Sequence, residues 1–151
     1  MGRIIKFALL TGLRPAEVVE SVRLINASPE LGMHYYNTEQ RTLEHFRYPE
    51  IFIRNTKKAY ISFVTPEIVK SVNNHLLHIP SHNAISRACN RRGLPCNMHL
   101  CRKVFASWLH KYGISAEIVD FLQGRVSTSV FSRHYLTPDS SLKYRVLAAL
   151  H

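Results

Sequence analysis

Three short segments of the sequence carry side chains of the types that phosphate chemistry uses. Arg14 stands in TGLRPAEV, between a glycine that ends one expected helix and a proline that starts the next. His99 and Arg102 stand three residues apart in HLCR, so they share one face at a helix start. Arg125 directly follows a glycine, and Tyr135 comes ten residues later. Guanidinium groups bind phosphate oxygens, imidazole transfers protons, and a tyrosine oxygen can act as a nucleophile.

Each segment alone also has an ordinary structural interpretation. An arginine at a helix junction commonly forms an ion pair, and a histidine and an arginine three residues apart commonly form a surface pair. A late tyrosine on an amphipathic helix commonly belongs to the core. The order and spacing of the three segments, taken together, favour a chemical role.

The composition is that of a basic globular domain. The chain has 151 residues, of which 46% are hydrophobic, so it can bury a core and is not disordered. No apolar run approaches the roughly 20 residues that cross a bilayer. Lys and Arg number 20 against 10 acidic residues, which gives a formal net charge of +10. This excess favours a polyanionic partner, with nucleic acid the first candidate and an anionic membrane surface the second.

The positions of the basic residues say more than their number. Many of them stand at the ends of expected elements, where they can converge on one site, whereas a solvated helix face would spread them evenly. They are Arg14, Arg54, Lys57, Lys58, Arg91, Arg92, Arg102, Lys103, Arg125 and Arg133.

Helical periodicity dominates the sequence outside residues 28–65. Gly12, Gly93, Gly113 and Gly124 act as stops, and prolines mark several starts. The pattern predicts helices over 3–11, 15–25, 66–79, 82–91, 98–112, 115–123, 128–136 and 138–150. In the helix at 98–112, the predicted buried face is Leu100, Val104, Trp108 and Leu109, with Phe105 and Tyr112 beside it.

Residues 28–65 are rich in Tyr, Ile, Phe and Val between turn-prone residues. The segments 33–37, 48–55 and 58–64 predict two or three short strands, with a turn at about 54–58. The expected fold class is therefore mainly α with a small antiparallel β-sheet (α+β), in a single domain over residues 1–151.

Three cysteines leave a metal site open as an alternative. With no secretory signal, reduced thiols are expected for Cys89, Cys96 and Cys101. A zinc site formed by these cysteines and His99 is the more specific alternative, but the spacing of the four residues matches none of the usual zinc-binding motifs. We therefore expect no metal and no cofactor.

The order of the chemical segments resembles the catalytic domain of the tyrosine recombinase, or phage integrase, family. That family has an Arg within TGLR-x-x-E, a Lys on a β-hairpin, H-x-x-R, a glycine followed by His or Trp, and a Tyr nine or ten residues later. The corresponding positions here are Arg14 with Glu17, the 54–58 turn, His99 with Arg102, Gly124-Arg125 and Tyr135. The resemblance covers roughly residues 4–140. Arg125 in place of His or Trp is most similar to archaeal viral (fusellovirus-type) integrases.

The resemblance implies a site-specific recombinase that cleaves and rejoins DNA through a 3′-phosphotyrosyl bond, without metal or ATP. Tyr135 is then the nucleophile, and Arg14 and Arg102 hold the non-bridging phosphate oxygens. His99 and Arg125 donate further hydrogen bonds, and His99 can also act as the base.

The resemblance also implies a hairpin cation that protonates the departing 5′-oxygen. Arg54, Lys57 and Lys58 are the three candidates, and Lys57 is favoured because an arginine is a poor acid. The remaining basic residues expected to grip DNA are Arg91, Arg92, Lys103 and Lys58.

The implied partners are double-stranded DNA and further copies of the chain. The family acts as a tetramer on DNA, in the host cytoplasm on the nucleoid, and no membrane partner is expected. The family's N-terminal core-DNA-binding domain is expected to be absent from this chain. The alternative is a non-catalytic DNA-binding or regulatory domain derived from an integrase.

Overall fold

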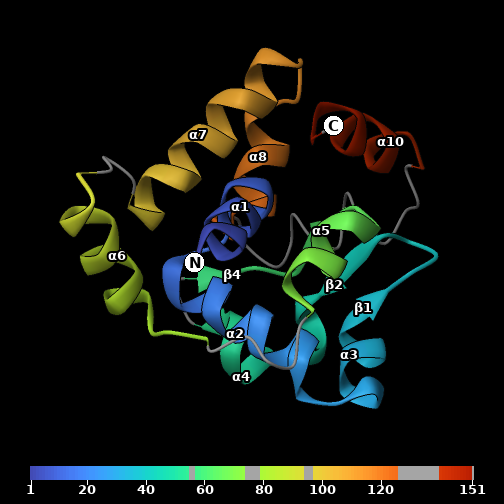
Figure 1. The fold of residues 1–151 in the computed structure, drawn as a ribbon. Helices are drawn as coiled ribbons and strands as arrows, with labels where there is room; N and C mark the ends of the chain where they lie inside the picture. Colours follow the sequence, from blue (N-terminus) through green and yellow to red (C-terminus); the bar gives the residue numbers. More distant parts are fainter. Residues whose placement is uncertain (55–56, 74–78, 94–96, 126–139, 151) are drawn as a thin grey trace.

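The structure, a computed structural model, describes residues 1–54, 57–73, 79–93, 97–125 and 140–150 (Figure 1). The described helices are α1 (Gly2–Thr11), α2 (Pro15–Ala27), α3 (Pro29–Tyr35), α4 (Pro49–Phe52), α5 (Pro66–Val72), α6 (His82–Arg91), α7 (Met98–Lys111), α8 (Ala116–Leu122) and α10 (Ser140–Leu150), with a 3-10 turn η1 (His45–Arg47). The described strands are β1 (Tyr36–Asn37), β2 (Thr42–Glu44), β3 (Ile53–Arg54), β4 (Lys57–Lys58) and β5 (Ile61–Phe63). The predicted fold class, mainly helical with a small antiparallel sheet, is confirmed.

The junction between α1 and α2 forms because of two residues with special backbones. Gly12 ends α1 in the left-handed region, at φ 63°. A Cβ there would also lie 2.3 Å from Cδ1 of Phe105 in α7, so only glycine fits. Pro15 then begins α2, and Glu17 in its first turn accepts a hydrogen bond from the backbone N–H of Arg14 (2.9 Å). Arg14 is thereby held between two fixed helix ends.

The strands form a three-stranded antiparallel sheet in the order β1-β2-β5 and a separate hairpin, β3-β4. The predicted turn at 54–58 is confirmed, since Arg54 lies opposite Lys57 in the hairpin register. Two predicted strand segments were partly wrong. Residues 33–35 belong to α3 and residues 49–52 to α4, each begun by a proline at the first helical position.

The central strand β2 was missed by the sequence pattern. Its three residues, Thr-Leu-Glu, have no strong strand composition, yet β2 pairs with β1 on one side and β5 on the other. Cross-strand pairing, rather than intrinsic preference, therefore decides its conformation. The helix predicted over 66–79 ends at Val72 as α5, and the helix predicted over 128–136 lies outside the described residues.

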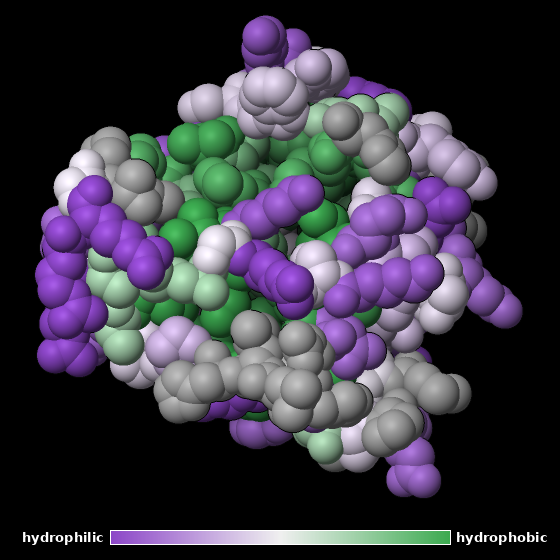
Figure 2. All heavy atoms as spheres, in the orientation of Figure 1, coloured by the Kyte–Doolittle hydropathy of each residue, from purple (hydrophilic) through white to green (hydrophobic). Residues whose placement is uncertain are grey.

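The face of α7 that enters the core differs from the predicted one. The buried residues are Met98, Cys101, Arg102, Phe105 and Leu109, which pack toward α1. Four residues predicted to lie in or beside the core are instead 39–53% exposed, and they are Leu100, Val104, Trp108 and Tyr112. Apolar side chains are therefore exposed on the surface at α7 (Figure 2). Two apolar stripes, each with four-residue spacing, run along this helix, and periodicity alone does not distinguish the stripe that packs.

A buried polar network connects α2 to the elements packed against it. The Tyr35 hydroxyl donates to Oγ of Ser21 (2.7 Å) and lies 2.7 Å from Nδ1 of His45. Nε2 of His45 lies 2.9 Å from Oγ of Ser62. A neutral ring satisfies all three contacts when Nδ1–H donates to Tyr35 and the Ser62 hydroxyl donates to Nε2. The network joins α2, α3, η1 and β5 in the interior.

The buried His45 predicts a loss of stability in acid. Burial lowers the pKa of His45 to about 3, below its usual value near 6.5. Between these values the unfolded chain binds a proton that the folded chain does not, so lowering the pH favours unfolding. We expect the unfolding free energy to fall by up to about 1.4 kcal/mol per pH unit from about pH 6 downward. Urea unfolding measured between pH 7 and pH 4 would show a smaller fall in unfolding free energy for His45→Gln than for the unsubstituted protein. Equal falls in the two proteins would contradict the attribution of this acid sensitivity to His45.

Candidate active site

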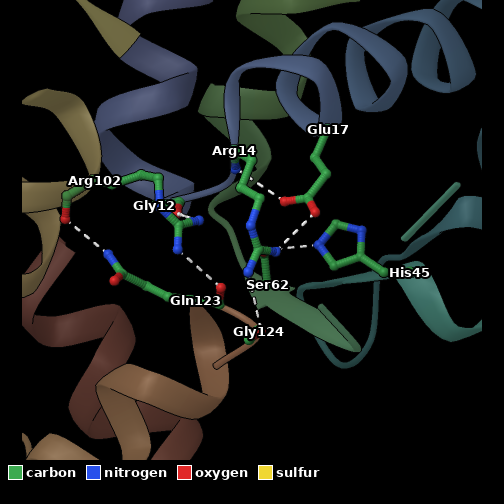
Figure 3. Close-up of polar contacts among 8 residues, drawn as sticks. All are labelled: Gly12, Arg14, Glu17, His45, Ser62, Arg102, Gln123 and Gly124. Carbon is green, nitrogen blue, oxygen red and sulfur yellow. Dashed lines mark hydrogen bonds and ion pairs between the residues drawn. The ribbon is translucent and has the colours of Figure 1, made fainter. Parts of the chain in front are cut away.

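Arg102 is a buried arginine that joins two helix ends. It lies in the second turn of α7 and is 7% exposed. Its Nη1 donates to the carbonyl oxygen of Gly12 (2.8 Å), and its Nη2 donates to the carbonyl oxygen of Gln123 (3.0 Å) (Figure 3). The Gln123 side chain returns a hydrogen bond from Nε2 to the Arg102 carbonyl (2.7 Å). Arg102 is therefore locked against the α1–α2 junction and the end of α8.

Arg14 reaches the end of α8 from the opposite side. Its Nη1 pairs with Oε1 of Glu17 at 2.9 Å, and its Nη2 donates to the carbonyl oxygen of Gly124 at 3.1 Å (Figure 3). The Glu17 side chain is 8% exposed and its second oxygen holds the Arg14 backbone N–H, so this carboxylate fixes both ends of the arginine.

The two guanidinium groups converge, because they donate to the carbonyls of neighbouring residues, Gln123 and Gly124. Burial first, and then the positive charge of Arg14, lower the pKa of Arg102 to about 10; Glu17 acts in the opposite direction. At that pKa the group remains charged at neutral pH. Each guanidinium carries five N–H donors, and the hydrogen bonds between described residues use two from each. Donors therefore remain for an anion.

Gly124 connects the arginine pair to the β3-β4 hairpin. Its carbonyl oxygen also accepts the backbone N–H of Lys58 (3.2 Å), so one oxygen binds both Arg14 and the hairpin. Its φ is +66°, and a Cβ on it would lie 2.7 Å from the Ala59 nitrogen. The close approach of α8 to the hairpin therefore requires glycine here.

A hollow of about 210 Å³ opens beside Arg14. Its lining residues are Arg14, Pro15, Ala16, Glu17, Arg54, His82 and His99. This volume is below the range of sites for drug-sized molecules and suits a single small charged group. The lining brings His99, at the start of α7, together with Arg14 and the hairpin residue Arg54. Since Glu17 is already paired with Arg14, the hollow presents a net positive charge.

Arg125 lies at the exposed margin of this site. Its Nη1 pairs with Oδ1 of Asp120 at 3.2 Å, and its side chain is 52% exposed. It directly follows Gly124, whose carbonyl oxygen accepts from Arg14, so its backbone lies beside the arginine pair. Arg125 is thus near the arginine pair but bound at the surface to a carboxylate.

The other predicted site residues are placed only in part. Tyr135 lies outside the described residues, and Lys57 is described through its backbone alone, opposite Arg54. Lys58 is half-buried beside Gly124. The three remaining residues predicted to grip DNA are all exposed, and they are Arg91 and Arg92 at the end of α6 and Lys103 on α7.

Sequence reasoning missed two residues of the site. Gln123 is fully buried and braces Arg102 in both directions, yet in the sequence it was only a polar residue before a helix stop. His82 lines the hollow from the first position of α6, and no spacing rule pointed to it. Both depend on contacts between segments that are distant in the chain.

The cysteines that the structure describes are buried in the core. Cys89 in α6 and Cys101 in α7 are reduced thiols that form no disulfide bond with each other, whereas Cys96 lies outside the described residues. Within the described ranges, no group of three or more His, Cys, Asp or Glu side chains could hold a metal ion. In the same part of the chain, no helix has the length and apolar character that a membrane span requires.

Comparison with known proteins identifies a family. A family model described as archaeal phage integrase matches residues 2–141 of the chain. No match was found among curated proteins or among solved structures.

Proposed function

The chain belongs to the archaeal phage integrase family, which ties it to site-specific DNA recombination, and we propose that it is a tyrosine recombinase. It cleaves and rejoins double-stranded DNA through a 3′-phosphotyrosyl intermediate, with Tyr135 as the nucleophile. The observation that carries the proposal is the convergence of Arg14 and Arg102 on the end of α8, beside the hollow that His99 also lines.

The arginine pair suits the charge that develops on a reacting phosphodiester. In phosphoryl transfer, negative charge spreads over the non-bridging oxygens, and fixed positive groups stabilise it without having to reorganise. Arg14 and Arg102 are already held by backbone carbonyls and Glu17, so their remaining N–H groups are oriented in advance. Arg125 adds a donor from the surface once it leaves Asp120.

The proposed reaction conserves the energy of the phosphodiester bond. The Tyr135 oxygen attacks phosphorus and its proton passes to His99, while the bond to the 5′-oxygen breaks. That oxygen takes a proton from the hairpin cation, for which we propose Lys57, opposite Arg54 in the hairpin. A 5′-hydroxyl of another strand then attacks the phosphotyrosine and releases Tyr135, so rejoining needs no separate energy source.

Arg54 has a different role in this proposal. It lines the hollow with Arg14 and His99, which favours it as a phosphate ligand rather than as the acid. The duplex backbone beyond the reacting phosphate is bound by the exposed Arg91, Arg92 and Lys103 and by Lys58, which lies beside Gly124. The active assembly on DNA is a tetramer. Binding of this kind weakens steeply as salt rises.

Covalent trapping tests the proposal even though the target sequence is not specified. The protein is incubated in EDTA with a pool of randomised duplexes that carry one nick, so that cleavage near the nick releases a short fragment and traps the protein on DNA. We expect an adduct that survives denaturing electrophoresis, and DNA recovered from it identifies the cleavage site. Loss of the adduct in Tyr135→Phe identifies the nucleophile.

The trapping experiment also has an outcome that rejects the proposal. Binding to the pool without any adduct, at several pH values and DNA concentrations, would favour a non-catalytic DNA-binding domain. An adduct that persists in Tyr135→Phe would contradict the assignment of the nucleophile.

A further inference from the structure

His82 enters the hollow from a part of the chain that the proposed mechanism does not use. It is the first residue of α6, after the cap residue Ser81, whose Oγ accepts the Ala84 N–H at 3.3 Å. Figure 1 shows α6 at the edge of the molecule, and the helix packs on α2, which begins at the residue after Arg14. His82 therefore lines the same hollow as Arg14 but belongs to a separate helix.

The ring of His82 is available for a ligand. It is half-buried, and among the described residues no hydrogen bond or ion pair engages it. His99 lines the same hollow from α7, so histidines from two different helices share the hollow with Arg14. Histidine can donate a hydrogen bond to an anionic oxygen in either its neutral or its charged form.

The charge of the hollow identifies the kind of ligand. Among the described residues of the lining, Arg14 and Arg54 are the cationic groups, and the one carboxylate, Glu17, is held by the side chain and backbone of Arg14. A further hydrogen-bond donor beside two guanidinium groups fits an anionic group with several acceptor oxygens, which a DNA phosphate supplies.

We propose that His82 is a DNA-binding residue that donates a hydrogen bond to a phosphate oxygen of the strand seated between Arg14 and Arg54. This inference rests on the proposed function for the identity of the ligand. Because the contact is made as soon as the phosphate is bound, it serves binding more than the chemical step, and its loss raises the DNA concentration needed for half-maximal reaction.

Two substitutions and a control test the contact, with the duplex recovered from covalent trapping as the substrate. For His82→Ala we expect the half-saturating DNA concentration for adduct formation to rise about tenfold, while the maximal rate changes less than threefold. His82→Gln retains an N–H donor and is expected to stay within about threefold of the unsubstituted protein. The matched control is His34→Ala, an exposed histidine of α3 outside this hollow.

Chemical modification of the unsubstituted protein gives a second measurement that does not depend on a variant folding. Diethyl pyrocarbonate modifies histidine rings, and mass spectrometry reports each site. We expect bound duplex from the randomised pool, which is available whether or not an adduct forms, to protect His82 and to leave His34 reactive. The inference is overturned if DNA leaves His82 as reactive as before, if His82→Ala binds and reacts normally, or if His82→Gln is as defective as His82→Ala.

These outcomes are distinct from failure of the proposed function. If DNA protects His82 but no adduct ever forms, His82 is a DNA ligand in a protein that does not cleave. If the adduct forms normally and His82 is neither protected nor sensitive to substitution, the recombinase stands and this inference fails.

Discussion

Replacing Arg102 with lysine is expected to reduce covalent adduct formation by at least about a hundredfold, although the charge is kept. The guanidinium bridges the carbonyl oxygens of Gly12 and Gln123, and in the proposed mechanism its remaining N–H groups hold the phosphate. A lysine ammonium is a compact charge without the planar fork, so it cannot bridge both carbonyls and also hold a phosphate. Loss of one fixed donor to the transition state commonly costs a hundredfold or more in rate.

The same substitution is expected to destabilise the fold. One buried carbonyl loses its charged donor, and an unsatisfied buried acceptor costs about 2 kcal/mol. Chemical unfolding measures this cost separately from the rate of adduct formation. Arg145→Lys is the matched control, because Arg145 also donates to a glycine carbonyl, that of Gly113, but at an exposed position. Near-normal adduct formation by Arg102→Lys would show that the buried guanidinium group of Arg102 does not act on the phosphate.

The positions of the arginines could be predicted from the sequence because glycine and proline mark the helix ends beside them. Gly12 and Pro15 bracket Arg14, and Gly124 precedes Arg125; both glycines have a positive φ. Local backbone chemistry therefore indicated that these residues stand at junctions, where side chains from several elements can meet. The structure brings Arg14, Arg102 and His99 to one region.

What holds the arginines could not be predicted, because their acceptors are backbone oxygens far away in the chain. Arg102 is 90 residues from Gly12, and Arg14 is 110 residues from Gly124. A carbonyl oxygen has no sequence signature, since every residue carries one. Gln123 and His82 escaped notice because their contacts also join segments that are distant in the chain. The apolar stripe of α7 that packs on α1 could not be identified because both stripes have the same periodicity.

The arginine pair also holds the elements of the site together. The carbonyls of Gly12, Gln123 and Gly124 accept from Arg14 and Arg102, and Gly124 accepts from the hairpin as well. The side chains proposed for catalysis are therefore also the braces between α1, α2, α8 and the hairpin. Substitutions at these positions will affect folding and activity together, so each needs a control that separates the two.

Gly124→Ala is expected to damage both the fold and the site although it removes no functional group. A left-handed backbone costs an alanine about 1–2 kcal/mol, and here the new Cβ would also lie 2.7 Å from the Ala59 nitrogen and 2.9 Å from the Lys58 carbonyl carbon. Relief requires α8 or the hairpin to move. We expect a loss of about 3 kcal/mol in unfolding free energy, measured by urea denaturation.

The same movement would displace the acceptor of Arg14 and the hairpin that carries the proposed acid, and misplacement by about 1 Å can lower a rate a hundredfold. Gly113→Ala provides the comparison, because Gly113 has φ +75° but nothing within 4 Å of a Cβ, so it incurs the backbone cost without the clash. We expect Gly113→Ala to lose about 1 kcal/mol and to form adduct at a near-normal rate. Equal losses of stability and activity in the two alanine variants would mean that the contact between Gly124 and the hairpin does not position the site.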